Sequence, residues 1–267
     1  MLYKIGDVAK ILGISPDIMR YYEKKGIVKP HKDSLNDYRY YEVWDVNFLI
    51  ECLWFKQYDF GMKDIAKIIS DSSYDELRDT LKKKQEELEI KIIYQQQLLA
   101  RLKLQNQYLD QGREYMGKCD IQDSPEMIRY LNRYNFLYDD SEEVQKLGKQ
   151  WLAYFPFISR CFDISLDVLM NKGTDFAWGF SMLTIFAEKL SVKIDEPVEY
   201  VHSCKCLHSV FKQKGKYGFS PQQLEYITDY AKEDGLKICG HAIGNLLCSV
   251  REDDVMTGYF EVWIPIE

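Results

Sequence analysis

The chain has 267 residues, of which 46% are apolar, and its formal net charge is −7. This length and composition supply real hydrophobic cores for two domains, or for one domain with an elongated element. No apolar run is long enough to span a bilayer and Met1–Lys4 does not open a signal peptide, so we expect a cytoplasmic protein with no membrane partner. Seven cysteines without the spacing of a small secreted framework favour reduced thiols.

The first predicted elements are two short helices joined by a tight turn. Apolar residues from Ile5 to Leu12 have helical spacing, and Gly13 suits the left-handed end of that helix. Ser15 is a good N-cap, and Pro16 fits the first position of a second helix. This pair predicts a helix-turn-helix, a motif whose second helix enters the major groove of DNA.

Basic and hydroxylated side chains gather on the second helix and just after it. Arg20, Tyr21, Tyr22 and Lys24 are types that neutralise phosphates or hydrogen-bond to the sugar-phosphate backbone. The turn-rich stretch 27–41 predicts a small hairpin, or wing, with Asn36-Asp37 at its turn. Asp45 then caps a third helix, and Gly61 opens a fourth.

This order of elements resembles the MerR family of transcription regulators. The resemblance rests on the helix-turn-helix, the RYYE sequence at 20–23, the YRYY sequence at 38–41 and the FGMKDI sequence at 60–65. It implies a winged helix-turn-helix that binds double-stranded promoter DNA and acts on RNA polymerase at the promoter. The side chains that we expect to contact DNA are Lys4, Arg20, Tyr21, Tyr22, Lys24, Tyr38, Arg39, Tyr41 and Lys63.

The acidic excess lies outside this first part of the chain. Residues 1–70 hold 11 Lys+Arg and 10 Asp+Glu, whereas the remainder holds 24 and 32. A nearly neutral DNA-binding domain, here called the reader domain, attracts DNA weakly. We therefore expect a locally basic face and two copies acting together.

Residues 74–116 predict a long helix with a heptad seam. Leu81, Leu88, Gln95, Leu102 and Leu109 lie seven residues apart, and Gln85, Ile92, Leu99 and Asn106 follow the first four of them at a distance of four. A helix of that length buries its apolar stripe against a partner. The resemblance implies an antiparallel coiled coil and a homodimer; a single helix packed on its own protein is the alternative.

The remaining residues predict a mixed α+β domain. The expected order is an extended stretch 124–138, a helix from about Ser141 to Phe155, strands at 164–170, 176–186 and 200–211, a helix from Ser220 to Tyr230, and strands at 238–250 and 259–266. Two βαββ units would make a duplicated domain. The final strand resembles that of GyrI-like ligand-binding domains. The fold class is therefore α+β multidomain, with a winged helix-turn-helix at 1–73, a dimerisation helix at 74–117 and a GyrI-like effector-binding domain at 118–267.

Aromatic residues and a carboxylate suggest what the last domain binds. Tyr259, Glu261 and Trp263 share one face of the final strand, and Trp178 and Phe180 share a face of an earlier one. With Tyr154 they are our ligand-binding candidates, suited to a small lipophilic aromatic compound that is cationic or neutral. The penultimate strand has no carboxylate at 243–247, where such domains often keep one. Plain core aromatics and a solvated Glu261 are the alternative.

Other functions stay open. His202, Cys204, Cys206 and His208 lie at alternate positions, which leaves metal or thiol sensing as an alternative, although we predict no metal site and no cofactor. Hydrolysis of reactive small molecules, with Glu261 as general base, is a second alternative, and binding of another protein is a third. We expect no enzyme. The sequence predicts a ligand-responsive transcription activator that distorts its promoter.

Overall fold

A computed structural model describes residues 2–33, 38–215 and 219–267, which fall into two compact units, 1–95 and 96–267. Each unit is described by itself. Helix α5 (Tyr74–Glu114) contributes residues to both. None of the described helices is long and apolar enough to cross a membrane.

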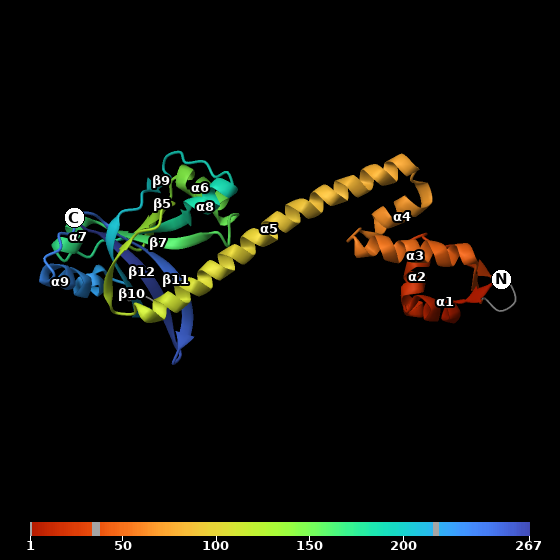
Figure 1. Cartoon of the computed structure of the whole chain (residues 1–267), viewed down its shortest axis with the longest axis horizontal. Coiled ribbons are helices and arrows are strands. Elements are labelled where there is room, and N and C mark those ends of the chain that lie inside the picture. Colours follow the sequence, from red (N-terminus) through yellow and green to blue (C-terminus); the bar gives the residue numbers. More distant parts are fainter. Residues whose placement is uncertain (1, 34–37, 216–218) are drawn as a thin grey trace. The chain divides into compact units, whose positions relative to one another are not determined.

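The N-terminal unit consists of helices with a small antiparallel sheet at their edge (Figure 1). Its helices are α1 (Ile5–Leu12), α2 (Pro16–Lys24), α3 (Val43–Gln57), α4 (Met62–Asp71) and the first part of α5. Its strands, in the order β1-β3-β2, are β1 (Tyr3–Lys4), β2 (His31–Lys32) and β3 (Arg39–Tyr41).

Local signals explain where these helices begin and end. Gly13 ends α1 with a φ of 65°, which a residue without a Cβ adopts readily. The Ser15 hydroxyl accepts a hydrogen bond from the Ile18 N–H and so caps α2. Asp45 helps to cap α3, as its sequence position suggested, but from the third helical position, because the helix begins at Val43 and Glu42 is its N-cap. The Asp45 carboxylate accepts a hydrogen bond from the Glu42 N–H and so forms part of a capping box. The core of this unit includes Met19, Tyr22, Tyr41, Leu49 and Ile65.

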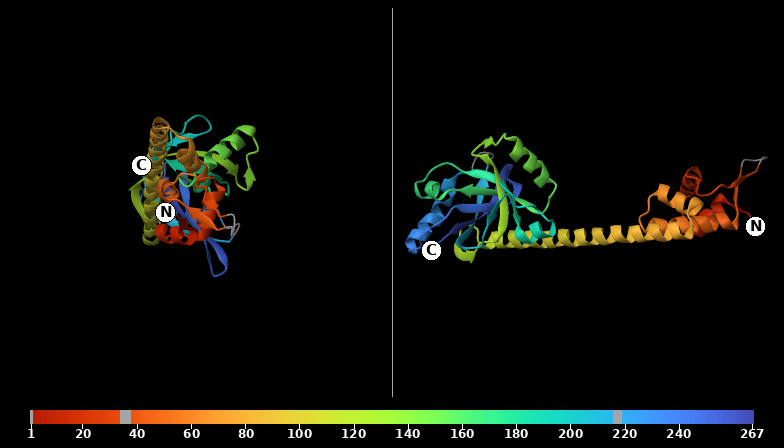
Figure 2. Two further views of the ribbon diagram at one scale, coloured as in Figure 1. Left: turned by 90° about the vertical axis from the view of Figure 1, so that its right-hand side faces the viewer. Right: turned by 90° about the horizontal axis from the view of Figure 1, so that it is seen from above.

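The C-terminal unit contains a large antiparallel sheet (Figure 2). Its strand order is β4-β10-β12-β11-β7-β8-β5-β6, and β9 pairs with β5. The strands are β4 (Cys119–Asp123), β5 (Met127–Tyr134), β6 (Leu137–Tyr138), β7 (Ile158–Ile164), β8 (Ala177–Leu183), β9 (Glu199–Val201), β10 (Lys205–Lys214), β11 (Ala242–Glu252) and β12 (Val255–Pro265). The helices are α6 (Glu142–Leu152), α7 (Leu166–Met170), α8 (Thr184–Lys189), the 3-10 helix η1 (Pro221–Leu224) and α9 (Glu225–Glu233).

Two of the predicted strands are wrong in part. The stretch 164–170 is mainly the helix α7, because the Ser165 hydroxyl accepts a hydrogen bond from the Val168 N–H and caps a helical turn there. The stretch 176–186 ends as the helix α8. Along the chain, β5, α6, β7 and β8 precede β10, α9, β11 and β12, and the strands β7 and β11 pair with each other.

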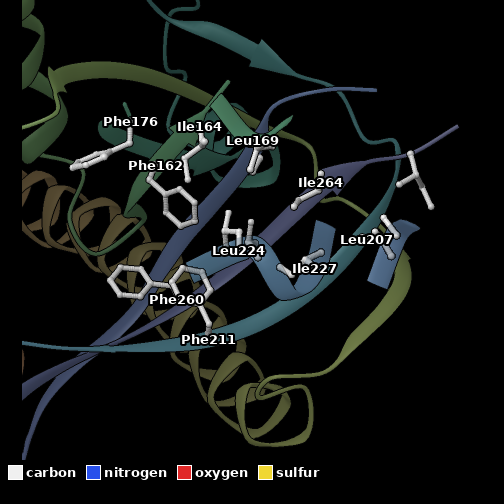
Figure 3. Packing of buried hydrophobic residues seen from close by; sticks show 14 of the residues in the cluster. Phe162, Ile164, Leu169, Phe176, Leu207, Phe211, Leu224, Ile227, Phe260 and Ile264 are labelled. Atoms are coloured by element: carbon white, nitrogen blue, oxygen red, sulfur yellow. The ribbon is translucent and has the colours of Figure 1, made fainter. Parts of the chain in front are cut away.

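The two faces of the sheet differ in character. One face carries aromatic and aliphatic side chains, including Phe162, Phe211 and Phe260, and packs against residues of η1 and α9 such as Leu224 and Ile227 (Figure 3). We call it the aromatic face. The opposite face carries Glu261, and cross-strand partners project to the same side, so Asn245 and Cys161 belong to it through the pairs Asn245–Glu261 and Asn245–Cys161. We call it the Glu261 face.

Candidate functional site

The second helix of the N-terminal unit presents polar groups to solvent. Arg20, Tyr21 and Lys24 on α2 are exposed, as a DNA-contacting surface requires. Nη1 of Arg20 lies 2.7 Å from Oδ1 of Asp17, but both side chains remain mostly in water, so the pair is weak and its guanidinium can exchange to a phosphate. The Nζ atom of Lys25 lies 5.5 Å from the centre of the Tyr21 ring.

The wing strand β3 is fastened to α2 by one carboxylate. Nε of Arg39 donates to Oε2 of Glu23 at 2.8 Å, and the Tyr41 hydroxyl donates to Oε1 of the same residue. Burial raises the pKa of Tyr41, and the hydrogen bond to Glu23 raises it further. Tyr41 is fully buried, so its side chain holds the wing in place; the prediction that it contacts DNA is wrong. Arg39 keeps a third of its side-chain surface exposed while paired to Glu23.

Tyr22 is also buried, and the prediction that its side chain contacts DNA is wrong. Its side chain packs in the core with Met19, three residues earlier on the same face of α2. Apolar residues three apart on a helix share a face, so this spacing was a signal that separated Tyr22 from its exposed neighbour Tyr21.

The remaining predicted DNA contacts lie at the surface. Lys4 and Tyr38 are exposed, and the Lys4 Nζ atom lies 5.8 Å from the centre of the Tyr38 ring. Lys63 is exposed in the first turn of α4. The predicted wing turn Asn36-Asp37 lies outside the described residues.

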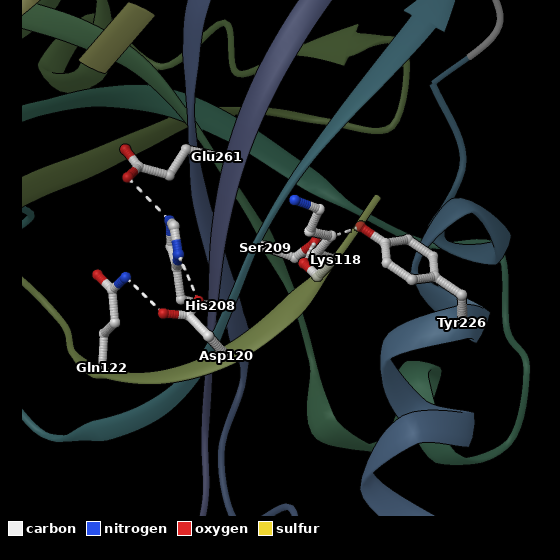
Figure 4. Close-up of polar contacts among 7 residues, drawn as sticks. All are labelled: Lys118, Asp120, Gln122, His208, Ser209, Tyr226 and Glu261. Atoms are coloured by element: carbon white, nitrogen blue, oxygen red, sulfur yellow. Dashed lines mark hydrogen bonds and ion pairs between the residues drawn. The ribbon is translucent and has the colours of Figure 1, made fainter. Parts of the chain in front are cut away.

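In the C-terminal unit, a buried histidine links two carboxylates (Figure 4). Nε2 of His208 on β10 lies 3.1 Å from Oε1 of Glu261 on β12, and Nδ1 lies 3.0 Å from Oδ1 of Asp120 on β4. Burial disfavours the charged imidazolium, but hydrogen bonds and charges from Glu261 and Asp120 outweigh it and raise the pKa of His208. Burial raises the pKa of Glu261, and its contact with His208 offsets part of that rise. This trio can hold and move a proton.

The C-terminal part of α5 covers Glu261. Arg101, Gln105 and Tyr108 line a cavity beside it, together with Ser181 and Asn245. Nε2 of Gln105 donates to the Leu247 carbonyl at 2.8 Å, and Nε of Arg101 donates to the Pro156 carbonyl at 3.1 Å. Burial raises the pKa of Tyr108 to about 12, and the charge of Glu261 adds to this rise. The cavity volume is about 20 Å³, which is room for a water molecule, so a larger ligand reaches Glu261 only if this cover moves.

The predicted ligand-binding residues do not form one site. Gly179 faces the same side as Glu261, through the pairs Asn245–Glu261, Asn245–Cys161 and Cys161–Gly179, so its neighbours Trp178 and Phe180 lie on the aromatic face. Their grouping with Glu261 is therefore wrong. Tyr154 packs against the same buried cluster as Phe180, and it also lines a cavity with residues of α6 and the segment 191–198.

Tyr259 and Trp263 do share the face of Glu261. The Trp263 ring centre lies 5.8 Å from that of His208, and this buried side chain packs with Met127 and Cys206. The Tyr259 hydroxyl donates to Glu252. Arg101 and Gln105 were absent from the predicted site, because no local pattern shows that a helix in a heptad repeat also covers a sheet.

The cysteine and histidine residues at 202–208 are only partly grouped. The Sγ atoms of Cys204 and Cys206 lie 3.6 Å apart, whereas His202 packs beside Tyr200 and His208 binds carboxylates. Within residues 2–33, 38–215 and 219–267, no three His, Cys, Asp or Glu side chains are grouped in a way that could hold a metal ion.

Comparisons with known proteins bear on the first part of the chain. Residues 3–72 match the model of the MerR HTH family regulatory proteins. Over 66 residues the chain is 35% identical to the HTH-type transcriptional regulator CueR of Escherichia coli, a match that covers 25% of this chain and 49% of CueR. The chain thus spans about half the length of the first curated relatives that it matches.

Two solved structures are also similar to the chain. An EcmrR–DNA complex determined in EcmrR-RPo is 15% identical, with 99% of each chain covered and a TM-score of 0.38. The N-terminal part of MtaN, the multidrug transporter activator of Bacillus subtilis, is 23% identical, with 38% of this chain and 94% of that chain covered and a TM-score of 0.35.

Proposed function

Residues 3–72 are a MerR-family helix-turn-helix domain, and from this premise we propose that the chain is a ligand-responsive, DNA-binding transcription regulator. The observation that carries the proposal is the match over this domain together with the exposed Arg20, Tyr21 and Lys24 on its second helix. The proposal assigns no enzymatic activity to the chain.

The proposed DNA partner is a double-stranded promoter. Because residues 1–70 carry nearly equal numbers of acidic and basic side chains, bulk attraction is small and binding depends on the local surface. Lys4, Tyr38, Arg39 and Lys63 would add phosphate contacts to those of α2. In this role the pair of bonds to Glu23 fixes the wing relative to α2 before DNA arrives, which reduces the entropy lost on binding.

We further propose a homodimer formed through α5. Ile92 in the N-terminal unit, and Leu99 and Leu102 in the C-terminal unit, expose 56%, 54% and 62% of their surface, respectively. These residues belong to the heptad seam, and apolar side chains at such spacing pack against a second helix. An antiparallel pair would supply the two reader domains that a pseudo-palindromic promoter needs.

The proposed effector is a small lipophilic aromatic compound, cationic or neutral, that binds near Glu261. A buried carboxylate beside Tyr108 and Trp263 supports attraction of a flat cation. Entry would displace the cover formed by Arg101, Gln105 and Tyr108, and α5 continues from that cover into the N-terminal unit. Movement of α5 would shift the reader domains, distort the promoter and realign it for RNA polymerase. The cytoplasm is the proposed location.

Selection of bound fragments from random double-stranded DNA tests the function. Full-length protein should enrich a pseudo-palindromic sequence, and its affinity should fall steeply with salt. Arg20→Ala should lose most of this affinity, whereas Arg251→Ala, an exposed arginine of the C-terminal unit, serves as the matched control. Lack of any enriched sequence, or equal affinity of Arg20→Ala and wild type at moderate salt, would contradict the proposal.

A further inference from the structure

A further cavity lies on the aromatic face, away from Glu261. Its volume is about 270 Å³, and its walls include Trp178, Phe176 and Phe260. A cavity of about 150 Å³ lined by apolar side chains admits benzene, so this one has room for a fused two-ring molecule. Aromatic walls of this kind favour a flat ligand that stacks against them or packs edge to face.

Two arginines make this cavity positively charged. The guanidinium carbon of Arg133 lies 5.2 Å from the centre of the Trp178 ring, and that of Arg160 lies 4.9 Å from the same ring. The cavity lining within the described part of the chain contains no Asp or Glu, and neither arginine forms an ion pair with a described acidic residue. Burial lowers the pKa of Arg160, and the nearby charge of Arg133 lowers it further. Two like charges held together without a carboxylate are an arrangement that an anion stabilises.

Unpaired polar atoms belong to the same lining residues. Nε of Arg133, Nε1 of Trp178 and Oγ1 of Thr257 are buried and have no hydrogen-bond partner among the described residues. Buried polar groups in native proteins almost always have a hydrogen-bond partner, so an unpaired group indicates a place where a water or a ligand binds. Here, three residues that line one cavity carry such groups.

We propose that this cavity binds a small aromatic carboxylate, with its ring against Trp178 and Phe260 and its carboxylate paired to Arg133 and Arg160. Arginine suits this role because its N–H groups match both oxygens of a carboxylate. This ligand is an anion, so it differs in charge from a cationic effector bound near Glu261. The proposal concerns the C-terminal unit alone, and it holds whether or not the chain binds DNA.

Calorimetric titration of full-length protein with 2-naphthoate tests the proposal. One ligand should bind per chain, and 2-naphthamide, which has the same shape but no charge, should bind about tenfold or more weakly because it loses a charged hydrogen-bond pair. Arg160→Gln should lower the affinity for 2-naphthoate by a similar factor. Arg160 is exposed, so this variant should fold, and an unchanged circular dichroism spectrum checks that it does.

Matched variants locate the binding. Arg251→Gln removes a charge from an exposed position on β11 and should leave the affinity unchanged. Glu261→Gln should also leave it unchanged, because Glu261 lies on the other face of the sheet. The proposal is overturned if 2-naphthoate does not bind at millimolar concentration, if the amide binds as tightly, or if Arg160→Gln binds like the wild type.

Discussion

Nε2 of His208 lies 3.1 Å from Oε1 of Glu261, and both side chains are buried in the C-terminal unit. With Asp120 on its other nitrogen, His208 gains most from being protonated, since only the imidazolium donates a hydrogen bond to both carboxylates.

This contact predicts that the protein loses stability as the pH rises above about 6.5. The pKa of His208 is raised on folding, so its contribution is fully present below the unfolded value of 6.5 and is lost as the pH rises through the folded value. The raised pKa of Glu261 acts in the same direction, beginning at its unfolded value of 4.5. Melting temperatures of wild type and His208→Gln should therefore differ less at high pH than near pH 6. His202→Gln, which alters an exposed imidazole, is the control; a constant difference would refute the assignment.

Glu23→Gln should loosen the wing. Glu23 accepts from both Arg39 and the buried Tyr41 hydroxyl, and weakening a buried hydrogen bond costs about 1–3 kcal/mol. Hydrogen–deuterium exchange of residues 39–41 should become faster, and DNA affinity should fall. Glu51→Gln, an exposed carboxylate on α3, should change neither. Unchanged exchange in Glu23→Gln would show that the wing is held by other contacts.

Leu102→Lys should convert the proposed dimer to a monomer. Leu102 lies in the heptad seam and is largely exposed, so the lysine harms no core within the chain but places like charges in a helix pair. Sedimentation equilibrium measures the change. Ile185→Lys, at another largely exposed apolar position, on α8, should leave the proposed dimer intact. A monomeric wild type, or a Leu102→Lys dimer of undiminished strength, would argue against the helix pair.

Asp163→Ala should destabilise the C-terminal unit strongly. Nη1 of Arg129 lies 2.6 Å from Oδ2 of Asp163, and each side chain is only 9% exposed. Removal of the Asp163 carboxylate leaves the buried guanidinium with Glu199, which is largely exposed, as its remaining ion-pair partner among the described residues. Such a loss costs about 3–5 kcal/mol, whereas replacement of both partners by apolar residues is often close to neutral. The free energy of unfolding, measured by chemical denaturation, should thus be lower for Asp163→Ala than for the double variant Arg129→Met/Asp163→Leu. The opposite order would mean that the site adapts to the free guanidinium.

Local signals predicted the N-terminal unit well. Gly13, Ser15 and Pro16 act through the backbone of adjacent residues, so their effect is visible in a single stretch of sequence. Tyr41 is buried in the core and its hydroxyl donates to a glutamate eighteen residues earlier in another element, and no local pattern shows these contacts. The resemblance of residues 3–72 to the MerR family was confirmed. It could be seen in the sequence because its motifs, like the helix-boundary signals, are contiguous.

The ligand-binding residues could not be grouped correctly from the sequence, because the sequence of one strand does not show how that strand pairs with its neighbours. Alternation placed Trp178 and Phe180 on a common side of one strand, and Glu261 and Trp263 on a common side of another. The register of the strand pairs β12–β11, β11–β7 and β7–β8 decides which of these sides coincide. It places Trp178 and Phe180 on one face of the sheet and Glu261 and Trp263 on the other.

Helix α5 holds Arg101 and Gln105 over the Glu261 cavity and exposes Leu99 and Leu102 in the same turns. If an effector moves this cover and a second copy packs on these leucines, the two equilibria are thermodynamically linked. The effector would change the dimer dissociation constant, and dimerisation would change the effector's affinity by the same factor. The dose–response curve would then shift with the cellular abundance of the protein itself.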